Sequence, residues 1–358
     1  MSVAGSYLQG RGLACALGLD LPRALARLAA GGVRPAMFES APDAFFPAFT
    51  IPDADPDWHA RGRRLVRAAV AECGPVDRSA PLFLASSSLN VGALEQGSPF
   101  LPDCQRFAED VAGWLDWRGP VFWVSTACTS SIVALLSAHR LIGAGEADSA
   151  LVLGLELTNR FSSAGFGALQ LLDPQAPRPL AADRAGLVLG EAVAAVCLGR
   201  KTARWRLRGG ANRVDGSNPA GASRHTVERM VHAALADSGI GAAEVDLIKL
   251  QAAGSPHNDA EEIAGLKAVF PCLPALGTLK ASIGHTLGAA GAAELALLTA
   301  CIDAGIWPEP PGCAPDPDLA VALAPRRPPR LRFILAQILG FGGGHAALVL
   351  EDCQESLS

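Results

Sequence analysis

Residues 120–142, PVFWVSTACTSSIVALLSAHRLI, decide the fold, because they predict a strand, a tight turn and a helix in one continuous run. Residues 121–124 are apolar and β-prone, and residues 125–131 are mostly small. Side chains typical of a buried helix face then recur at helical spacing, namely Ile132, Leu135, Leu136, His139 and Leu141. The run therefore predicts a buried strand, a turn that carries Cys128, and a buried helix.

Cys128 has two interpretations. A thiol at the start of a helix lies near unpaired N–H groups and the positive end of the helix dipole, which favour the nucleophilic thiolate. A free cysteine is also a common small apolar residue of protein cores. The small residues on both sides of Cys128 would let a substrate approach the sulfur, and they favour the chemical role.

Length and composition narrow the class of protein. The 358 residues suffice for two core-sized units or one duplicated fold, and a composition of 50% hydrophobic and 18% charged residues indicates many buried elements. A net charge of −5 gives no reason to expect nucleic acid or an anionic membrane as a partner. The nine cysteines show no CxxC spacing, so we expect free thiols in a reducing cytoplasm and no zinc site. The first residues show neither a signal peptide nor a membrane span.

Further strands and helices are predicted on both sides of this run. In the first half, we expect helices at 21–30 and 61–71 and strands at 81–85, 149–154 and 187–198. Residues 34–58 carry five prolines, and we expect them to form an irregular loop over a surface or an entrance. Residues 164–183 are also expected to be rich in loops.

The second half repeats the first in outline. A strand at 247–252 runs into a turn of small residues, and a strand at 274–280 leads into SIGHTLGAAGAAELALLTACI, residues 282–302. Residues 331–336 and 346–351 predict a closing β-hairpin around Gly340–Gly344. This repeat predicts an α/β fold with two similar halves, 1–200 and 201–358. His285 holds the place in the second copy that Cys128 holds in the first, so the two should meet at the centre.

The residues also indicate a chemistry. A thiolate that attacks a thioester needs donors for the oxyanion and a group that handles the proton, and His285 is the best candidate for that group. His285 is equally compatible with a purely structural role. Lys280 ends an apolar strand and, if buried, needs a partner, for which Glu261 and Glu262 are the candidates. The glycine run 340–344 suits an oxyanion hole better than a phosphate cradle, because a strand follows it.

Three motifs resemble the β-ketoacyl-acyl carrier protein synthases. They are TACTSS at 126–131, LKASIGHTLGAAGAAE at 279–294 and GFGGGHAALVLE at 340–351. The resemblance extends over essentially the whole chain and includes AGFGALQLLDP at 164–174 and RPLAADRAGLVLGEA at 178–192. It implies the five-layered αβαβα thiolase fold, normally in a dimer.

The resemblance implies a role for several residues. Cys128 corresponds to the nucleophile that receives the acyl chain from a carrier-protein thioester. His285 corresponds to the histidine that hydrogen-bonds the thioester carbonyl and stabilises the enolate left by decarboxylation. Lys280 corresponds to the lysine near that histidine, and Glu262 to the glutamate that commonly pairs with it.

The resemblance also implies the groups around the acyl chain. Phe341 corresponds to the gating phenylalanine, whose backbone N–H joins that of Cys128 in the oxyanion hole, and Gly342 lies in the same loop. Phe166 corresponds to a second aromatic residue that lines the acyl pocket. No cofactor is implied, and the expected partners are acyl- and malonyl-loaded acyl carrier protein.

One departure from the family pattern bears on the activity. The family usually has His-Gly-Thr-Gly-Thr-x-x-Asn-Asp, whereas residues 251–259 are QAAGSPHND, so Gln251 stands where the first active-site histidine belongs. A glutamine donates a hydrogen bond but does not titrate near neutral pH. We therefore expect impaired decarboxylation with intact acyl transfer. His257 is a candidate substitute, although its side chain is expected to point elsewhere. Smaller departures are Leu180-Ala181 for Phe-Asp and Gly344-His345 for Thr-Asn.

Three functions remain open at this point. The first is an enzyme that carries out decarboxylative condensation in fatty acid or polyketide-type biosynthesis. The second is a partner like the chain-length factors of type II polyketide or aryl-polyene systems, with little activity of its own. In the first case the dimer has like halves, and in the second it pairs with a complete ketosynthase. The third is an acyltransferase of the same fold that uses Cys128 without decarboxylation.

Overall fold

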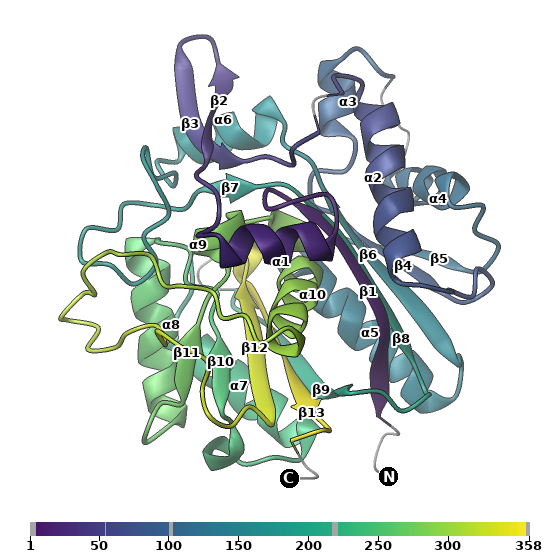
Figure 1. Cartoon of the computed structure of the whole chain (residues 1–358). Helices are drawn as coiled ribbons and strands as arrows, with labels where there is room; N and C mark the ends of the chain where they lie inside the picture. Colours follow the sequence, from purple (N-terminus) through teal and green to yellow (C-terminus); the bar gives the residue numbers. More distant parts are fainter. Residues whose placement is uncertain (1–4, 54, 100–102, 217–220, 356–358) are drawn as a thin grey trace.

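The computed structural model describes residues 5–53, 55–99, 103–216 and 221–355 (Figure 1). The strands are β1 Ser6–Cys15, β2 Ala36–Ala41, β3 Ala44–Phe49, β4 Leu82–Ala85, β5 Val121–Val124, β6 Ser149–Glu156, β7 Leu189–Gly190, β8 Ala192–Gly199, β9 Trp205–Val214, β10 Leu247–Lys249, β11 Ala275–Gly277, β12 Phe333–Leu339 and β13 Gly344–Asp352. The α-helices are α1 Leu21–Ala29, α2 Trp58–Glu72, α3 Val91–Glu95, α4 Cys104–Trp114, α5 Ser130–Ala144, α6 Arg160–Ala168, α7 Arg224–Ser238, α8 Pro256–Val269, α9 Lys280–Ile283 and α10 Ala290–Asp303. The 3-10 turns are η1 Ala242–Glu244, η2 Leu287–Ala289 and η3 Phe341–Gly343.

A ten-stranded sheet shows the internal repeat directly. Its order is β11-β10-β12-β13-β9-β1-β8-β6-β4-β5. Read from the two edges inward, the second half gives β11, β10, β12, β13 and β9, and the first half gives β5, β4, β6, β8 and β1. In both halves these are the third, second, fourth, fifth and first of its five strands along the chain. The directions match too: two parallel pairs at the edge of each half are followed by two antiparallel pairs. Within this sheet, the described strands of the two halves are joined by a short β1–β9 pairing at Ser6 and Tyr7. The predicted duplicated α/β fold is confirmed. The predicted boundary between the two halves, between residues 200 and 201, lies in the connection between β8 and β9. The assignment of the halves as two domains stays a prediction.

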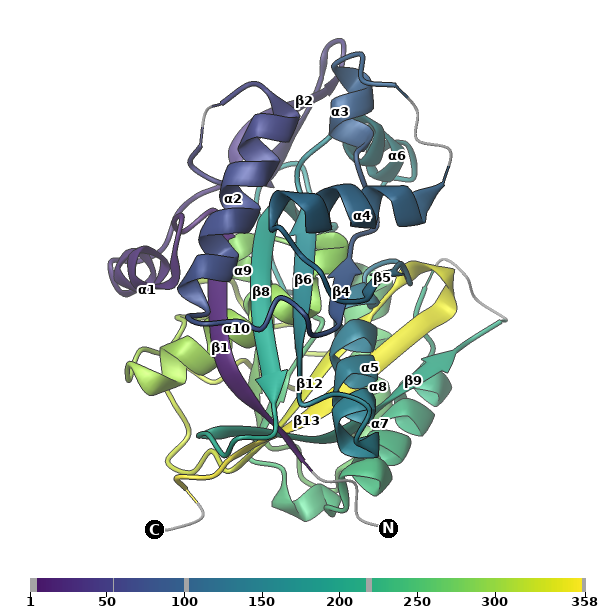
Figure 2. The same cartoon turned by 90° about the vertical axis from the view of Figure 1, so that its right-hand side faces the viewer.

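Five layers follow from the alternation of side chains along the strands. In β8, Val196 packs in a central core with α5 and α10, whereas Cys197 faces α2 and α4 on the outside. In β13, Leu348 faces the central core and Val349 faces α7 and α8. The order is therefore helices, sheet, the central pair α5 and α10, sheet, and helices (Figures 1 and 2).

The central helices approach each other closely at their starts. A Cβ atom added to Gly291 would lie 2.6 Å from the side chain of Ile132, so only glycine fits there. The Ala292 N–H also donates a buried hydrogen bond of 3.1 Å to Ser131 Oγ. The small residues that precede and begin α10 therefore bring the two copies of the strand–helix unit together.

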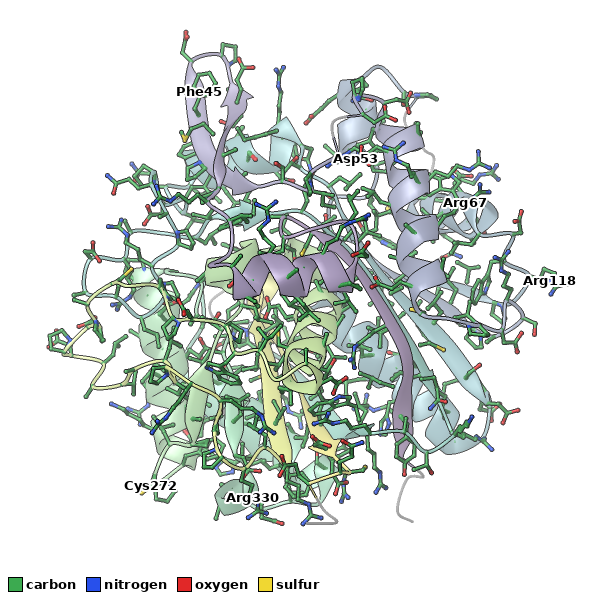
Figure 3. The ribbon with its side chains drawn as sticks, viewed as in Figure 1. Phe45, Asp53, Arg67, Arg118, Cys272 and Arg330 are labelled. Atoms are coloured by element: carbon green, nitrogen blue, oxygen red, sulfur yellow. The ribbon has the colours of Figure 1, made fainter. Side chains whose placement is uncertain are left out.

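The proline-rich segment at 34–58 is a correction to the sequence prediction. It contains the β2–β3 hairpin, which projects from the body with Phe45 at its outer end, 52% exposed (Figure 3). Pro47 is tolerated because β7 pairs only with Ala48 and Phe49, which leaves the rest of β3 as an edge. Residues 164–168 are the end of helix α6, and turns and loops follow from 169 to 183, so the prediction of a loop-rich segment is largely confirmed.

The strand before Cys128 is a second correction. We predicted a buried strand, but β5 is the last strand of the sheet and is only partly buried, with Phe122 43% exposed. Phe122 stacks on Phe83 of β4 with ring centroids 5.0 Å apart. A continuous apolar run does not distinguish a strand inside a sheet from a strand at its edge.

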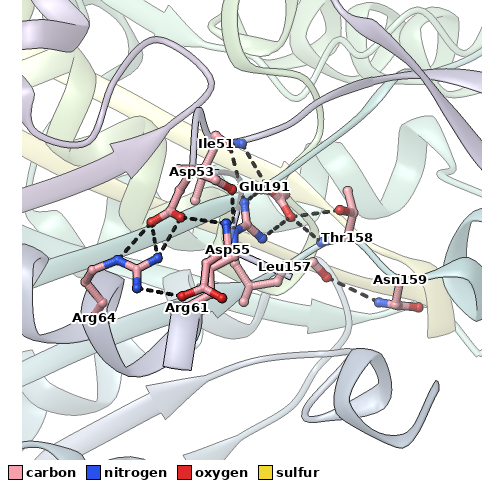
Figure 4. A network of polar contacts seen from close by, with 9 residues as sticks. All are labelled: Ile51, Asp53, Asp55, Arg61, Arg64, Leu157, Thr158, Asn159 and Glu191. Carbon is pink, nitrogen blue, oxygen red and sulfur yellow. Dashed lines mark hydrogen bonds and ion pairs between the residues drawn. The ribbon is translucent and has the colours of Figure 1, made fainter. Parts of the chain in front are cut away.

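A buried carboxylate ties the hairpin and α2 to the sheet (Figure 4). Glu191, 1% exposed, receives a two-pronged contact from Arg61, with Nη2 to Oε2 at 2.7 Å and Nη1 to Oε1 at 2.8 Å. It also accepts hydrogen bonds from the N–H groups of Ile51 and Thr158. These contacts outweigh the effect of burial and hold the pKa of Glu191 below its usual value.

Ala127–Ala144 is apolar and long enough to cross a bilayer by length and composition alone. However, 61% of this stretch is buried inside the protein. Because α5 belongs to the central core, its apolar character is explained by packing against β6 and α10.

Candidate active site

The turn between β5 and α5 holds Cys128 in a fixed position. Ala127 adopts the left-handed region with φ 52°, and the Ser130 hydroxyl donates to its carbonyl at 2.6 Å. The Thr126 N–H in turn donates to Ser130 Oγ at 2.9 Å. Cys128 lies two residues before the first residue of α5 and is 4% exposed. The predicted thiol at a helix start is therefore present.

Cys128 and His285 meet, as their positions in the two copies predicted. The distance from Sγ to His285 Nε2 is 3.0 Å. The backbone of His285 is fixed from both sides, since its N–H donates to Val188 at 2.7 Å and its carbonyl accepts from Gly190 at 3.0 Å. The loop after α9 and the segment around β7 therefore hold the imidazole against the sulfur.

Burial controls the protonation of both groups. Burial raises the pKa of the Cys128 thiol to about 11, against the opposing effects of the Lys280 charge and the Phe341 backbone N–H. The Cys128 N–H at the helix start favours the thiolate, but burial has the larger effect on the pKa of the thiol. Burial, and then the charges of Lys280 and Lys249, hold the pKa of His285 well below its usual value. Burial thus favours the neutral form of both groups.

Lys280 has a different partner from the one predicted. Its ammonium contacts Glu294 of α10, and Lys249 of β10 contacts the other oxygen of the same carboxylate. The three side chains are almost fully buried. Burial would raise the pKa of Glu294, but the two ammonium groups outweigh it and hold that pKa below its usual value. Burial lowers the pKa of Lys249 to about 8. The group thus joins two lysines to one carboxylate inside the protein.

Glu262 supports Gln251 instead of Lys280. Its carboxylate accepts from the N–H groups of Gln251 at 2.6 Å and Ala252 at 2.8 Å, and from the Gln337 amide at 2.6 Å. Glu261, the other candidate, accepts from the Arg224 N–H on the surface. The two acidic residues lie on α8, whereas the carboxylate that reaches Lys280 comes from α10.

The glycine loop lies beside the thiol. A Cβ on Gly340 would lie 3.4 Å from the Cys128 backbone nitrogen, and the Gly340 N–H donates to the Gly344 carbonyl at 2.8 Å. The Phe341 ring contacts Phe166 edge to face, with centroids 5.4 Å apart. Gly342 is exposed, with φ 78°, and belongs to the loop without reaching the thiol pocket. The loop therefore brings the backbone N–H of Phe341 toward the sulfur.

One pocket contains most of these groups. Its wall includes Cys128, His285, Gln251, Phe341 and His345. The side-chain oxygen of Gln251 is buried without a hydrogen-bond partner, and so are both ring nitrogens of His345. The sequence marked His345 only as a departure from the family pattern, and the pocket gives it a place. His257 is not available as a substitute for the missing histidine, because its Nε2 contacts the Ala222 carbonyl at 3.1 Å.

Comparison with family models gives two matches in tandem. Residues 94–203 match the model described as Beta-ketoacyl synthase, N-terminal domain. Residues 206–313 match the model described as Beta-ketoacyl synthase, C-terminal domain.

Individual proteins agree with these matches. Nodulation protein E of Rhizobium meliloti is 30% identical over 253 residues, which are 66% of this chain and 63% of that protein. The 3-oxoacyl-[acyl-carrier-protein] synthase 2 of the same species is 32% identical over 259 residues, with 65% of this chain and 61% of that protein covered. The chain thus spans less than two thirds of the length of these relatives. A solved structure of a ketosynthase (ApeO) in complex with its chain length factor (ApeC) from Xenorhabdus doucetiae matches with a TM-score of 0.84 and 26% identity over 98% of each chain.

Proposed function

The chain belongs to the β-ketoacyl synthase family and has its five-layered thiolase fold, and from this premise we propose that it is an acyltransferase of the β-ketoacyl-acyl carrier protein synthase type. Its reaction is the decarboxylative condensation of an acyl group held on Cys128 with a malonyl carrier protein. The observation that carries the proposal is the 3.0 Å contact between Cys128 Sγ and His285 Nε2 in a shared pocket.

The first step loads the acyl chain. The Cys128 thiol gives its proton to His285 Nε2 while sulfur attacks the carbonyl carbon of the carrier-protein thioester. The negative charge that develops on the carbonyl oxygen is stabilised by the backbone N–H groups of Cys128 and Phe341. The carbon–sulfur bond to the carrier then breaks, and the departing thiolate takes the proton from His285.

The second step forms the new carbon–carbon bond. His285 Nε2 takes up one proton from solvent. The bond between the malonyl carboxylate and its α-carbon breaks, carbon dioxide leaves, and the electron pair moves into an enolate whose oxygen accepts from His285 Nε2 and the Gln251 amide. The α-carbon attacks the acyl carbonyl, the thioester bond to Cys128 breaks with the electrons on sulfur, and the thiolate takes the proton from His285. Gln251 weakens this step, because an amide donates less effectively to a developing charge than the family's histidine.

A second function has an observation of its own. Gln251 removes a group of the condensation site while Cys128 and His285 remain. A chain-length-factor-like subunit that pairs with a complete ketosynthase would tolerate this loss. The similarity to a ketosynthase–chain length factor complex fits either member of such a pair. An acyltransferase that uses Cys128 without decarboxylation lies between the condensing enzyme and the inactive partner, because it keeps the first step of the reaction and lacks the second.

We assign the partner surface to the edge of the sheet at β5, where Gln105 of α4 already contacts the backbone of Val121 and Trp123. This strand ends the sheet next to Cys128, and its Phe122 is exposed beside Phe83. An edge strand with an exposed aromatic side chain favours contact with another chain. The same edge serves a homodimer or a heterodimer.

The first experiment separates the two functions. The chain is purified alone and after co-expression with a ketosynthase that has both active-site histidines, and the mass of each complex is measured by light scattering. Release of carbon dioxide from malonyl carrier protein is then measured for each. Robust decarboxylation by the isolated chain rules out the partner function. A heterodimer without activity of the isolated chain supports it.

A variant tests the account of the missing histidine. Gln251→His should raise decarboxylation by about tenfold or more, because it restores an imidazole beside the enolate. Gln354→His, at an exposed glutamine near the end of the chain, is the control and should change nothing. Unchanged decarboxylation in Gln251→His would refute this explanation of the defect.

A further inference from the structure

His345 is buried in the wall of the pocket that contains Cys128. The residue is 0% exposed, and neither of its ring nitrogens has a hydrogen-bond partner. A buried polar group without a partner costs free energy, which a hydrogen bond to a ligand or a water molecule would recover. The pocket is the place where a ligand would supply that hydrogen bond to His345.

The sheet places His345 on the way to the thiol. His345 pairs with Leu339 of β12, and both residues line the pocket. In β13 it shares the α7–α8 face with Ala347 and Val349, whereas Cys128 belongs to the central core. Residues from both faces of the sheet line the pocket, which therefore passes around the end of the sheet where β10 and β12 stop. It extends from the sulfur to the imidazole of His345.

The glycine loop fixes the backbone before His345 relative to Cys128. The Gly340 N–H donates to the Gly344 carbonyl at 2.8 Å, which closes the loop directly before His345. A Cβ on Gly340 would lie 3.4 Å from the Cys128 backbone nitrogen, and a Cβ on Gly344 would lie 3.7 Å from Thr129 Oγ1. One compact unit of backbone thus holds both the nucleophile and the imidazole.

The other polar side chains on this part of the wall already have partners. Asn258 Oδ1 accepts the Ala222 N–H at 2.9 Å, and Ser255 Oγ accepts the Asn258 N–H at 3.4 Å. The Asp259 carboxylate accepts several backbone N–H groups. Outside the groups of the proposed reaction, His345 is the side chain of the described pocket wall whose buried polar atoms have no partner.

The two ring nitrogens match an amide. A neutral imidazole has one N–H donor and one acceptor nitrogen, and an amide offers a carbonyl oxygen and an N–H. Burial lowers the pKa of His345, against the opposing effects of the Gly344 backbone and the Asp215 carboxylate, and so favours the neutral ring. Pantetheine, the arm that joins a thioester to a carrier protein, contains amide groups.

We propose that His345 determines specificity in the proposed reaction by binding an amide of the pantetheine arm while the thioester reaches Cys128. The inference rests on the proposed function, because it takes Cys128 as the acyl acceptor. His345 then acts on thioesters whose thiol part contains an amide and has no effect on thioesters that lack one.

A series of thioesters of one acid tests this role. Acyl-pantetheine, acyl-N-acetylcysteamine and an S-butyl thioester are incubated with the purified chain, and acylation of Cys128 is followed by mass spectrometry of its peptide. In His345→Leu the second-order rate constant for the amide-bearing thioesters should fall about tenfold, because a buried hydrogen bond to the arm is lost. The rate constant for the S-butyl thioester should stay within about twofold. His232→Leu, at an exposed histidine of α7, is the matched control and should equal the wild type.

A second variant separates binding from folding. His345→Gln keeps a donor and an acceptor, so its rate constants should fall by less than about threefold. His345→Leu should keep the wild-type unfolding midpoint in urea, because it breaks no hydrogen bond of the ring within the protein. Equal losses for all the thioesters in a folded variant, or no loss for any, would overturn the role of His345 and leave the proposed function intact. A wild-type Cys128 that no thioester acylates would overturn both.

Discussion

The two copies of the strand–helix unit share a backbone plan but differ in chemistry. The first unit, residues 121–144, carries the thiol and has Arg140 as its only lysine, arginine or acidic residue. The second unit, residues 275–303, carries Lys280, His285 and Glu294. Its helix α10 is buried at every residue except Asp303, whereas α5 leaves Arg140 exposed.

This difference assigns one task to each unit. In the proposed reaction, the first unit provides the nucleophile on a tight turn, and the second provides the imidazole and the buried Lys280–Glu294 pair. Neither unit is a site by itself, because the sulfur and the ring nitrogen come from opposite halves of the chain. The chemistry therefore depends on how closely α5 and α10 pack, which Gly291 permits.

Removal of the thiol should have the largest effect. In Cys128→Ala, acyl transfer from an acyl thioester should fall by more than about a thousandfold, since no nucleophile remains in the pocket. Intact-protein mass spectrometry after incubation with the thioester measures the acyl adduct. Cys272→Ala removes an exposed cysteine and should leave the adduct unchanged. An adduct that persists in Cys128→Ala would assign acylation to another residue. The first unit would then no longer be the one that carries the nucleophile.

Loss of the shared carboxylate should be the next largest effect. Glu294→Gln leaves two buried ammonium groups without an anion, and we expect the free energy of unfolding to fall by about 3–5 kcal/mol. Urea denaturation at pH 7 measures it. Glu261→Gln, which changes a surface carboxylate that accepts one N–H, should cost no more than about 1 kcal/mol. If both variants lost the same free energy of unfolding, the buried Glu294 would matter no more than a surface carboxylate, which would contradict this difference between the units.

In the loop 340–344, the free energy of unfolding should depend strongly on Gly343 and weakly on the neighbouring Gly342. A Cβ on Gly343 would lie 2.0 Å from the Asp215 carbonyl oxygen, whereas Gly342 has open space, and both have positive φ. Gly343→Ala should therefore lower the free energy of unfolding by about 3 kcal/mol and Gly342→Ala by about 1 kcal/mol. Urea denaturation of both variants measures the difference. Similar losses would show that φ, and not the contact with Asp215, limits this loop.

The smallest predicted effect concerns acid stability of the first unit. Burial lowers the pKa of His139 on α5 to about 4, below the 6.5 of the unfolded chain, so the unfolded state binds more protons between these values. The stabilisation is complete above pH 6.5 and is lost as the pH falls. Between pH 7 and 5 the wild type should lose about 1–2 kcal/mol more than His139→Gln. Urea midpoints at the two pH values measure this, and parallel losses would refute it.

Much of the fold and part of the site could be predicted from the sequence. The repeat of strand, small-residue turn and helix was enough to place Cys128 against His285, because equivalent positions in a duplicated fold meet at its centre. The glycine run beside the thiol and the closing hairpin also follow from local sequence. These features depend on periodicity and on glycine, which the sequence shows directly.

The remaining features depend on which side chains face each other. Glu294 lies in an apolar helix and Lys249 in an apolar strand, so spacing does not reveal that both reach Lys280. Glu262, close to Gln251 in sequence, was the more obvious partner for Lys280 and was wrong. The edge position of β5 and the hairpin in the proline-rich segment depend on long-range strand pairing, which local composition does not encode.

The short β1–β9 pairing has a consequence for the folding of the newly synthesised chain. β1 begins at residue 6, but its main partner is β8, at residues 192–199, and His285 emerges from the ribosome later still. The nucleophile half can pack its own sheet before the second half exists, while the Cys128 thiol still lacks its imidazole and the lysine charges. Such long-range pairing is slow to form. The residues of the proposed reaction therefore come together only after both halves have been made.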